Sequence, residues 1–168
     1  GFLEKEFSMV QPVIGFAGLT HLGLNSAVAS AAKGFSTVGY HNDNALIAQL
    51  KNGDPHVLEP QLPELMKQHQ DKMIFSADLG SLTQCNIVYI AVDVPTDNKG
   101  KSDLTPIEEM INSVSTVMHS DALLVVLCQV PPGFTRTLKW PVEQLYYQVE
   151  TLIFGRAIER ALFPERFI

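Results

Sequence analysis

The chain has 168 residues, of which 46% are apolar and 18% charged; these values exclude a disordered polymer and indicate one domain with a substantial core. The net charge of −6 argues against nucleic-acid and membrane-surface partners, because both are bound through basic patches. No apolar run reaches the roughly 18 residues that span a bilayer, and residues 1–10 lack the long apolar core of a signal peptide.

In the first half of the chain, apolar runs of strand length alternate with segments of helical periodicity. We expect, in chain order, a buried strand, a helix, a second strand, two helices and a short third strand: Pro12–Ala17, His21–Lys33, Ser36–Tyr40, Asn44–Lys51, Glu59–His69 and Met73–Phe75. Gly34 ends the first helix, since glycine adopts the backbone conformation of helix C-termini without strain. Asp43 precedes the second helix and is expected to be its N-cap.

The second half continues the alternation. We expect a central strand, a helix, a wholly apolar strand, a sixth strand and a final helix: Asn86–Val92, Thr105–Met118, Ala122–Cys128, Gln144–Gln148 and Gly155–Phe163. Thr105-Pro106-Ile107-Glu108 has the pattern of a capping box with proline at the first helical position, which predicts where the middle helix begins.

Continuous apolar strands that alternate with helices indicate a parallel sheet covered on both faces. The predicted fold is therefore α/β and Rossmann-like: a doubly wound, mostly parallel six-stranded sheet in the order 3-2-1-4-5-6. Residues 11–168 form one predicted domain, and residues 1–10 are an N-terminal extension in which Met9 is a candidate start. Ligands of such folds bind where the strands end, which directs attention to the loops at 18–23, 41–43, 93–103 and 129–135.

The cysteines and histidines give no sign of a metal site. Cys85 and Cys128 lie far apart, each beside a strand-like run, and are expected to be reduced core thiols, which suggests the cytoplasm. The five histidines have no metal-ligand spacing, so no metal is expected.

The loop Gly18-Leu19-Thr20-His21-Leu22-Gly23 follows a strand and opens a helix, as the dinucleotide-binding fingerprint does. That fingerprint has three glycines, and Thr20 replaces the middle one, which normally lets the backbone approach the pyrophosphate. The loop therefore predicts a dinucleotide site that Thr20 crowds, and an ordinary tight turn remains the alternative.

Further segments carry a resemblance. Each matches a family pattern, in family order: Leu58-Glu59-Pro60-Gln61-Leu62, Ile90-Ala91-Val92-Asp93-Val94-Pro95, Asp103-Leu104, Val130-Pro131-Pro132-Gly133-Phe134-Thr135, Gly155-Arg156-Ala157 and Phe163-Pro164-Glu165-Arg166. Together they resemble the N-terminal NAD-binding domain of the UDP-glucose/GDP-mannose dehydrogenase family. The resemblance implies a part in oxidising C6 of a nucleotide sugar. It assigns cofactor contacts to Gly18, Thr20, His21, Leu22, Gly23, His41, Val94, Pro95 and Gln129.

The sequence departs from the family at polar positions. The family places an acid after the second strand, where it accepts from the adenosine ribose, and here that residue is His41. A neutral imidazole accepts one hydrogen bond and lacks charge assistance, so NAD binding is expected to be weak or lost. Val94 stands where the family has a threonine. A histidine tolerates a 2′-phosphate, which leaves NADP as a less favoured cofactor.

The resemblance implies little catalytic apparatus. Glu150 matches a family glutamate, Gln129 replaces a threonine that helps hold the catalytic water, and Phe154 replaces a second glutamate. The family's sugar-binding and thiol-bearing domains have no counterpart in these residues, so the chain alone is expected to be inactive. The alternative is a non-catalytic Rossmann module that binds another nucleotide ligand or a protein partner. The sequence is compatible with binding to a partner chain and with assembly into a homo-oligomer.

Overall fold

The computed structural model of the chain describes residues 11–56, 59–93, 103–127, 141 and 144–147. The predictions for Val94, Pro95, Cys128, Gln129, Glu150 and the final helix therefore lie outside the described residues. Within the described ranges, no helix is long and apolar enough to cross a membrane.

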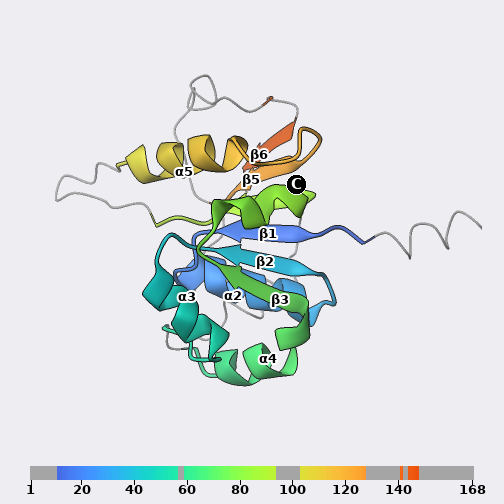
Figure 1. Ribbon diagram of the computed structural model, residues 1–168, viewed down its shortest axis with the longest axis vertical. Helices are drawn as coiled ribbons and strands as arrows, with labels where there is room; N and C mark the ends of the chain where they lie inside the picture. The colour runs from blue at the N-terminus through green and yellow to red at the C-terminus, as the bar shows by residue number, and fades with distance from the viewer. Residues whose placement is uncertain (1–10, 57–58, 94–102, 128–140, 142–143, 148–168) are drawn as a thin grey trace, which may run out of the picture.

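A parallel sheet forms the centre of the molecule (Figure 1). Its strands are β1 Ile14–Ala17, β2 Thr37–Tyr40, β3 Met73–Ser76, β4 Ile87–Ile90, β5 Leu123–Val126 and β6 Leu145–Tyr147. They lie in the order β3-β2-β1-β4-β5-β6, and all five neighbouring pairs are parallel. The predicted order and the parallel pairing are confirmed, and the jump from β3 back beyond β1 to β4 creates the switch point of a doubly wound sheet.

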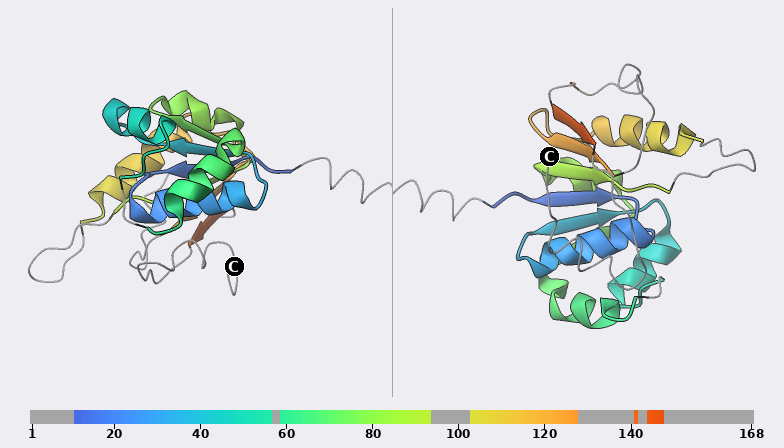
Figure 2. Two further views of the ribbon diagram at one scale, coloured as in Figure 1. Left: turned by 90° about the horizontal axis from the view of Figure 1, so that it is seen from below. Right: turned by 180° about the vertical axis from the view of Figure 1, so that it is seen from behind.

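Helices cover both faces of the sheet (Figures 1 and 2). They are α2 His21–Ala32, α3 Asn44–Lys51, α4 Leu62–Gln68 and α5 Thr105–Ser115, with 3₁₀ turns η1 Gln70–Lys72 and η2 Leu79–Gln84. One apolar cluster joins the α2 side to Phe16 and Tyr89, whose rings stack with centroids 5.0 Å apart. The other joins α5 and η2 to Val38 and Val88. The alternation of strand residues between two buried faces explains why the strands read as continuous apolar runs.

One helix start and one helix cap differ from the sequence prediction. The helix predicted from Glu59 begins at Leu62, because Glu59 is buried and turns its carboxylate towards α2. The predicted capping box at Thr105 is wrong: Leu104 is the N-cap of α5, and the Thr105 N–H donates to the Asp103 carboxylate at 3.0 Å. That hydrogen bond is the main cause that lowers the pKa of Asp103.

Cys85 is a free, buried thiol, as predicted. It packs against Gly15 so closely that a Cβ at Gly15 would lie 2.8 Å from the Cys85 sulfur. Burial raises the pKa of Cys85 to about 12, because a thiolate would lose its hydration in the core. Cys85 is therefore a packing residue and not a nucleophile.

Candidate functional site

The 18–23 loop lies where β1 ends and α2 begins, beside the ends of β2 and β4. Gly18 has φ 103°, in the left-handed region that favours glycine, and its N–H donates to the Tyr40 carbonyl at 2.9 Å. A Cβ at Gly18 would lie 2.7 Å from the Ala91 carbonyl oxygen. Gly18 therefore meets both requirements of the first fingerprint glycine, a tight turn and a close approach to the neighbouring strand.

Gly23 allows α2 to pack onto the end of β1. A Cβ there would lie 1.8 Å from the Gly18 carbonyl oxygen and 3.1 Å from the Ala91 side chain. The first of these neighbours is backbone, which has little freedom to move. Gly23 therefore performs the packing role of the last fingerprint glycine.

We expect Gly23→Ala to lower the free energy of unfolding by about 3 kcal/mol or more, since a methyl group cannot fit without displacing α2. Chemical denaturation monitored by circular dichroism measures the change. Gly80→Ala is the matched control, because its nearest neighbour is the Asp78 side chain at 3.4 Å. Equal destabilisation by the two variants would contradict the close packing at Gly23.

Thr20 occupies the position of the middle glycine. Its φ of −79° is open to any residue, so the turn itself does not require glycine here. Thr20 is the N-cap of α2, yet its side chain makes no capping hydrogen bond, and its hydroxyl oxygen is buried with no partner among the described residues. The first N–H groups of α2 thus receive no help from Thr20, and a helix N-terminus of this kind suits a phosphate.

His41 follows β2 and contacts the loop directly. Its Nδ1 accepts a hydrogen bond from the Leu19 N–H at 3.0 Å. A second histidine contacts the other polar backbone group of Leu19: His56 Nε2 lies 2.5 Å from the Leu19 carbonyl oxygen. Both polar backbone groups of Leu19 are therefore engaged by histidines, and the one ring nitrogen of His41 that accepts is already used within the chain.

Burial is the largest influence on His41 and lowers the pKa of its imidazole; Asp43 and Asp93 oppose this lowering, and His56 reinforces it. The neutral ring is also the form that accepts from the Leu19 N–H. The folded protein therefore favours the neutral form of His41 more strongly than the unfolded chain does.

As the pH falls through about 6.5, we expect His41 to destabilise the fold, because the unfolded chain takes up the proton first. The stability that neutral His41 contributes is fully present above that pH. It is lost as the pH falls to the lower pKa that His41 has in the folded state. Thermal unfolding of the wild type and of His41→Asn, measured at neutral and mildly acidic pH, tests this. The wild type should lose more stability on acidification, and parallel losses would rule out a role for His41.

Asp43 is engaged within the chain through one of its carboxylate oxygens. Its carboxylate accepts from the N–H groups of Ala45 and Leu46 at 3.0 and 3.1 Å. This confirms Asp43 as the N-cap of α3. The described end of β2 therefore offers His41 and an aspartate that caps α3.

A second contact joins α2 to the segment that precedes α4. His21 Nε2 and Glu59 Oε1 lie 2.5 Å apart, and the Glu59 side chain is 2% exposed. The sequence placed His21 among the cofactor contacts and used Glu59 only as part of a motif. Neither this pair nor the contact of His56 had a periodic signal that could have revealed it.

Among the described residues, no three potential metal ligands come together.

The comparisons with known proteins agree with this geometry. The family model for the UDP-glucose/GDP-mannose dehydrogenase family, NAD binding domain, matches residues 13–167. A UDP-N-acetyl-D-mannosamine dehydrogenase of Pyrococcus horikoshii is 28% identical over 79% of this chain and 32% of its own length. A UDP-glucose 6-dehydrogenase of Rickettsia typhi is 26% identical over 92% of this chain and 38% of its own length.

Solved structures show the same fold. The UDP-D-ManNAc dehydrogenase of Pyrococcus horikoshii superimposes with a TM-score of 0.79 at 24% identity, covering 88% of this chain and 38% of that one. The chain thus spans about a third of the length of the relatives it matches, between 32% and 38%. On the match over residues 13–167, the chain belongs to the UDP-glucose/GDP-mannose dehydrogenase family and comprises its NAD-binding domain.

Proposed function

We propose that the chain is the cofactor-binding part of a nucleotide-sugar 6-dehydrogenase-like protein of the cytoplasm, that it binds NAD weakly, and that it does not oxidise a nucleotide sugar by itself. The observation that carries the proposal is the close packing at Gly18 and Gly23, which keeps the N-terminus of α2 against the ends of β1 and β4. The dinucleotide-binding fingerprint uses its first and last glycines in this arrangement.

The residues present fit one end of NAD better than the other. The loop from Gly18 to Gly23 would hold the pyrophosphate at the N–H groups of α2, with the Thr20 side chain crowding the approach. The adenosine ribose would meet His41, whose accepting nitrogen is engaged by Leu19. When bound, NAD supplies a hydride acceptor, and the part of this chain is to hold it.

Calorimetric titration of the folded chain with NAD, NADP and UDP-glucose tests the proposal. We expect weak NAD heats that do not saturate at micromolar concentrations, and still weaker ones with NADP because Asp43 and Asp93 lie near His41. Low-micromolar NAD affinity would contradict the weak binding. The same titration with Gly23→Ala, at a temperature where that variant is folded, should abolish any heat that arises at this loop.

A second function is favoured by one observation. His41 and His56 complete the hydrogen bonding of the Leu19 N–H and C=O groups. These two backbone groups of the loop therefore need no ligand as a hydrogen-bond partner. A non-catalytic module that binds another nucleotide ligand or a protein partner would have this property. Saturable binding of UDP-glucose in the absence of NAD would favour it over the first proposal.

A further inference from the structure

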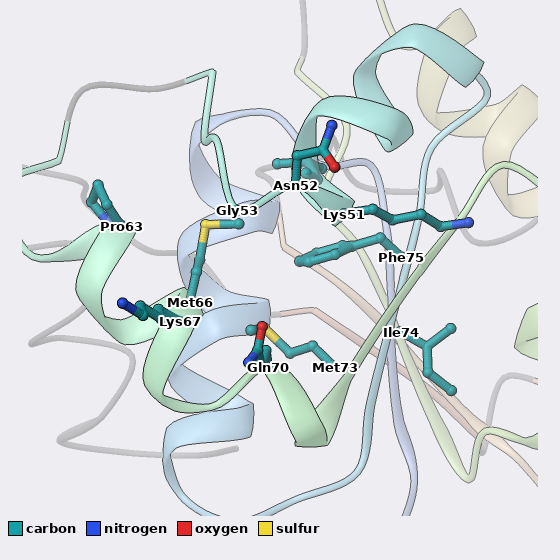
Figure 3. A pocket seen from close by; sticks show the side chains of 11 residues that line it. Lys51, Asn52, Gly53, Pro63, Met66, Lys67, Gln70, Met73, Ile74 and Phe75 are labelled. Carbon is teal, nitrogen blue, oxygen red and sulfur yellow. The ribbon is translucent and has the colours of Figure 1, made fainter.

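A groove of about 870 Å³ lies beside β3, far along the chain from the cofactor loop (Figure 3). It is built by the end of α3, by α4 and η1, and by β3 itself. None of its lining residues belongs to the 18–23 loop or to the histidines around Leu19. The groove is therefore a separate feature of the domain, and the proposed cofactor site does not account for it.

The groove has an apolar floor and a basic rim. Leu50, Met66 and Phe75 are buried and form the floor. Figure 3 shows the Phe75 ring and the Met66 side chain between β3 and α4. Lys51 and Lys67 are exposed lining residues, and no carboxylate is among the residues that line the groove. The lining itself therefore carries two positive charges and no negative one, and the acids Asp54, Glu64 and Asp71 lie outside it.

The backbone of β3 offers hydrogen bonds along the groove. β3 is the edge strand and pairs with β2 alone. The His41 N–H donates to the Ser76 carbonyl at 3.2 Å, so the Ser76 backbone faces β2. In a parallel ladder the residues alternate, which directs the N–H and C=O of Phe75 away from β2. These groups can pair with another strand.

The strand β3 is only four residues long, but no charge, proline or bulge within it protects its free edge. Ile74, the residue before Phe75 in β3, is 55% exposed. Among the described residues it is the large apolar side chain that is exposed. Edge strands are usually protected by inward-pointing charges, prolines or bulges, because an open edge pairs with other chains. Met73, Ile74 and Phe75 provide none of these devices. An open edge beside an apolar groove is the arrangement that binds peptides by strand addition.

We infer that β3 and its groove bind an extended acidic segment of a partner protein, which adds to the sheet as a seventh strand next to β3. Its backbone pairs with the Phe75 N–H and C=O, an apolar side chain enters the groove, and its carboxylates lie near Lys51 and Lys67. Charge selects this occupant, because Lys51 and Lys67 are the charged residues of the lining, whereas Asp54, Glu64 and Asp71 lie outside it. A second copy paired about a two-fold axis would bring the same lysines together.

The test uses a short fluorescent peptide that alternates glutamate with valine and leucine, and a control peptide with lysine in place of glutamate. By fluorescence anisotropy, the acidic peptide should bind and the basic one should not. The double variant Lys51→Glu/Lys67→Glu should weaken binding about tenfold or more. Lys33→Glu, the same type of substitution away from the groove but with half the charge change of the double variant, should leave binding unchanged. These exposed positions are outside the core, so the variants are expected to fold.

Hydrogen exchange tests the strand itself: the bound peptide should slow exchange at the Phe75 amide. The inference is overturned by equal binding of both peptides, by affinity that survives the double variant, or by unchanged exchange at Phe75. It is also overturned if the chain dimerises by light scattering and the double variant abolishes the dimer, because the occupant is then a second copy. The NAD titration does not depend on this groove, so the two proposals fail independently.

Discussion

Replacing Thr20 with glycine and His41 with aspartate in one variant is expected to tighten NAD binding by about 30- to 5,000-fold, which corresponds to about 2–5 kcal/mol. The glycine removes the side chain from the N-cap of α2, where the pyrophosphate approaches. The aspartate restores a charged acceptor that can accept from the Leu19 N–H with one oxygen and from the ribose with the other. Calorimetric titration with NAD gives the two affinities.

The single variants separate the two causes. His41→Asn supplies a neutral oxygen of similar reach, so a gain with aspartate that asparagine does not reproduce isolates the charge. Thr20→Ser keeps the hydroxyl and removes the methyl group, which shows how much of the crowding is steric. An NAD affinity that is unchanged in the double variant would contradict the assignment of this loop to NAD, provided that circular dichroism shows the variant folded.

The 168-residue chain, mixed with NAD and UDP- or GDP-sugars, is expected to form no reduced cofactor above the buffer blank. Oxidation to the acid requires a nicotinamide beside C6, a base with positioned water, and a thiolate that holds the aldehyde. The resemblance places Gln129 and Phe154 where the family has its water-holding threonine and second glutamate, and phenylalanine cannot transfer a proton. Cys85 does not replace the thiolate, since burial raises its pKa to about 12.

Absorbance of the reduced cofactor measures this, with an active nucleotide-sugar dehydrogenase as the positive control. Turnover above the blank that Glu150→Gln abolishes would show a working site and would contradict the prediction. Turnover that survives Glu150→Gln indicates a contaminating enzyme instead. Turnover that appears only when a second chain is added would place the sugar-binding half on that partner.

The sequence alone determined the sheet and the frame of the site. Strands of four residues buried on both faces gave the apolar runs, and glycines at 34 and 53 with positive φ ended the helices, so element type and the parallel order followed from local pattern. Asp43 was identified as a cap for the same reason, because its contacts are two and three residues away. The sequence also predicted the roles of Gly18 and Gly23, because each role depends on the local geometry of the loop.

Only the tertiary structure decided which hydrogen-bond partners the polar groups of the site have. His41 meets Leu19 across 22 residues, His56 meets it across 37, and His21 meets Glu59 across 38, and no periodicity relates side chains at such separations. The helix α4 starts later than predicted because Glu59 is buried against α2, a long-range contact that overrode local preference. The open edge of β3 likewise exists only once β2 has paired on its other side.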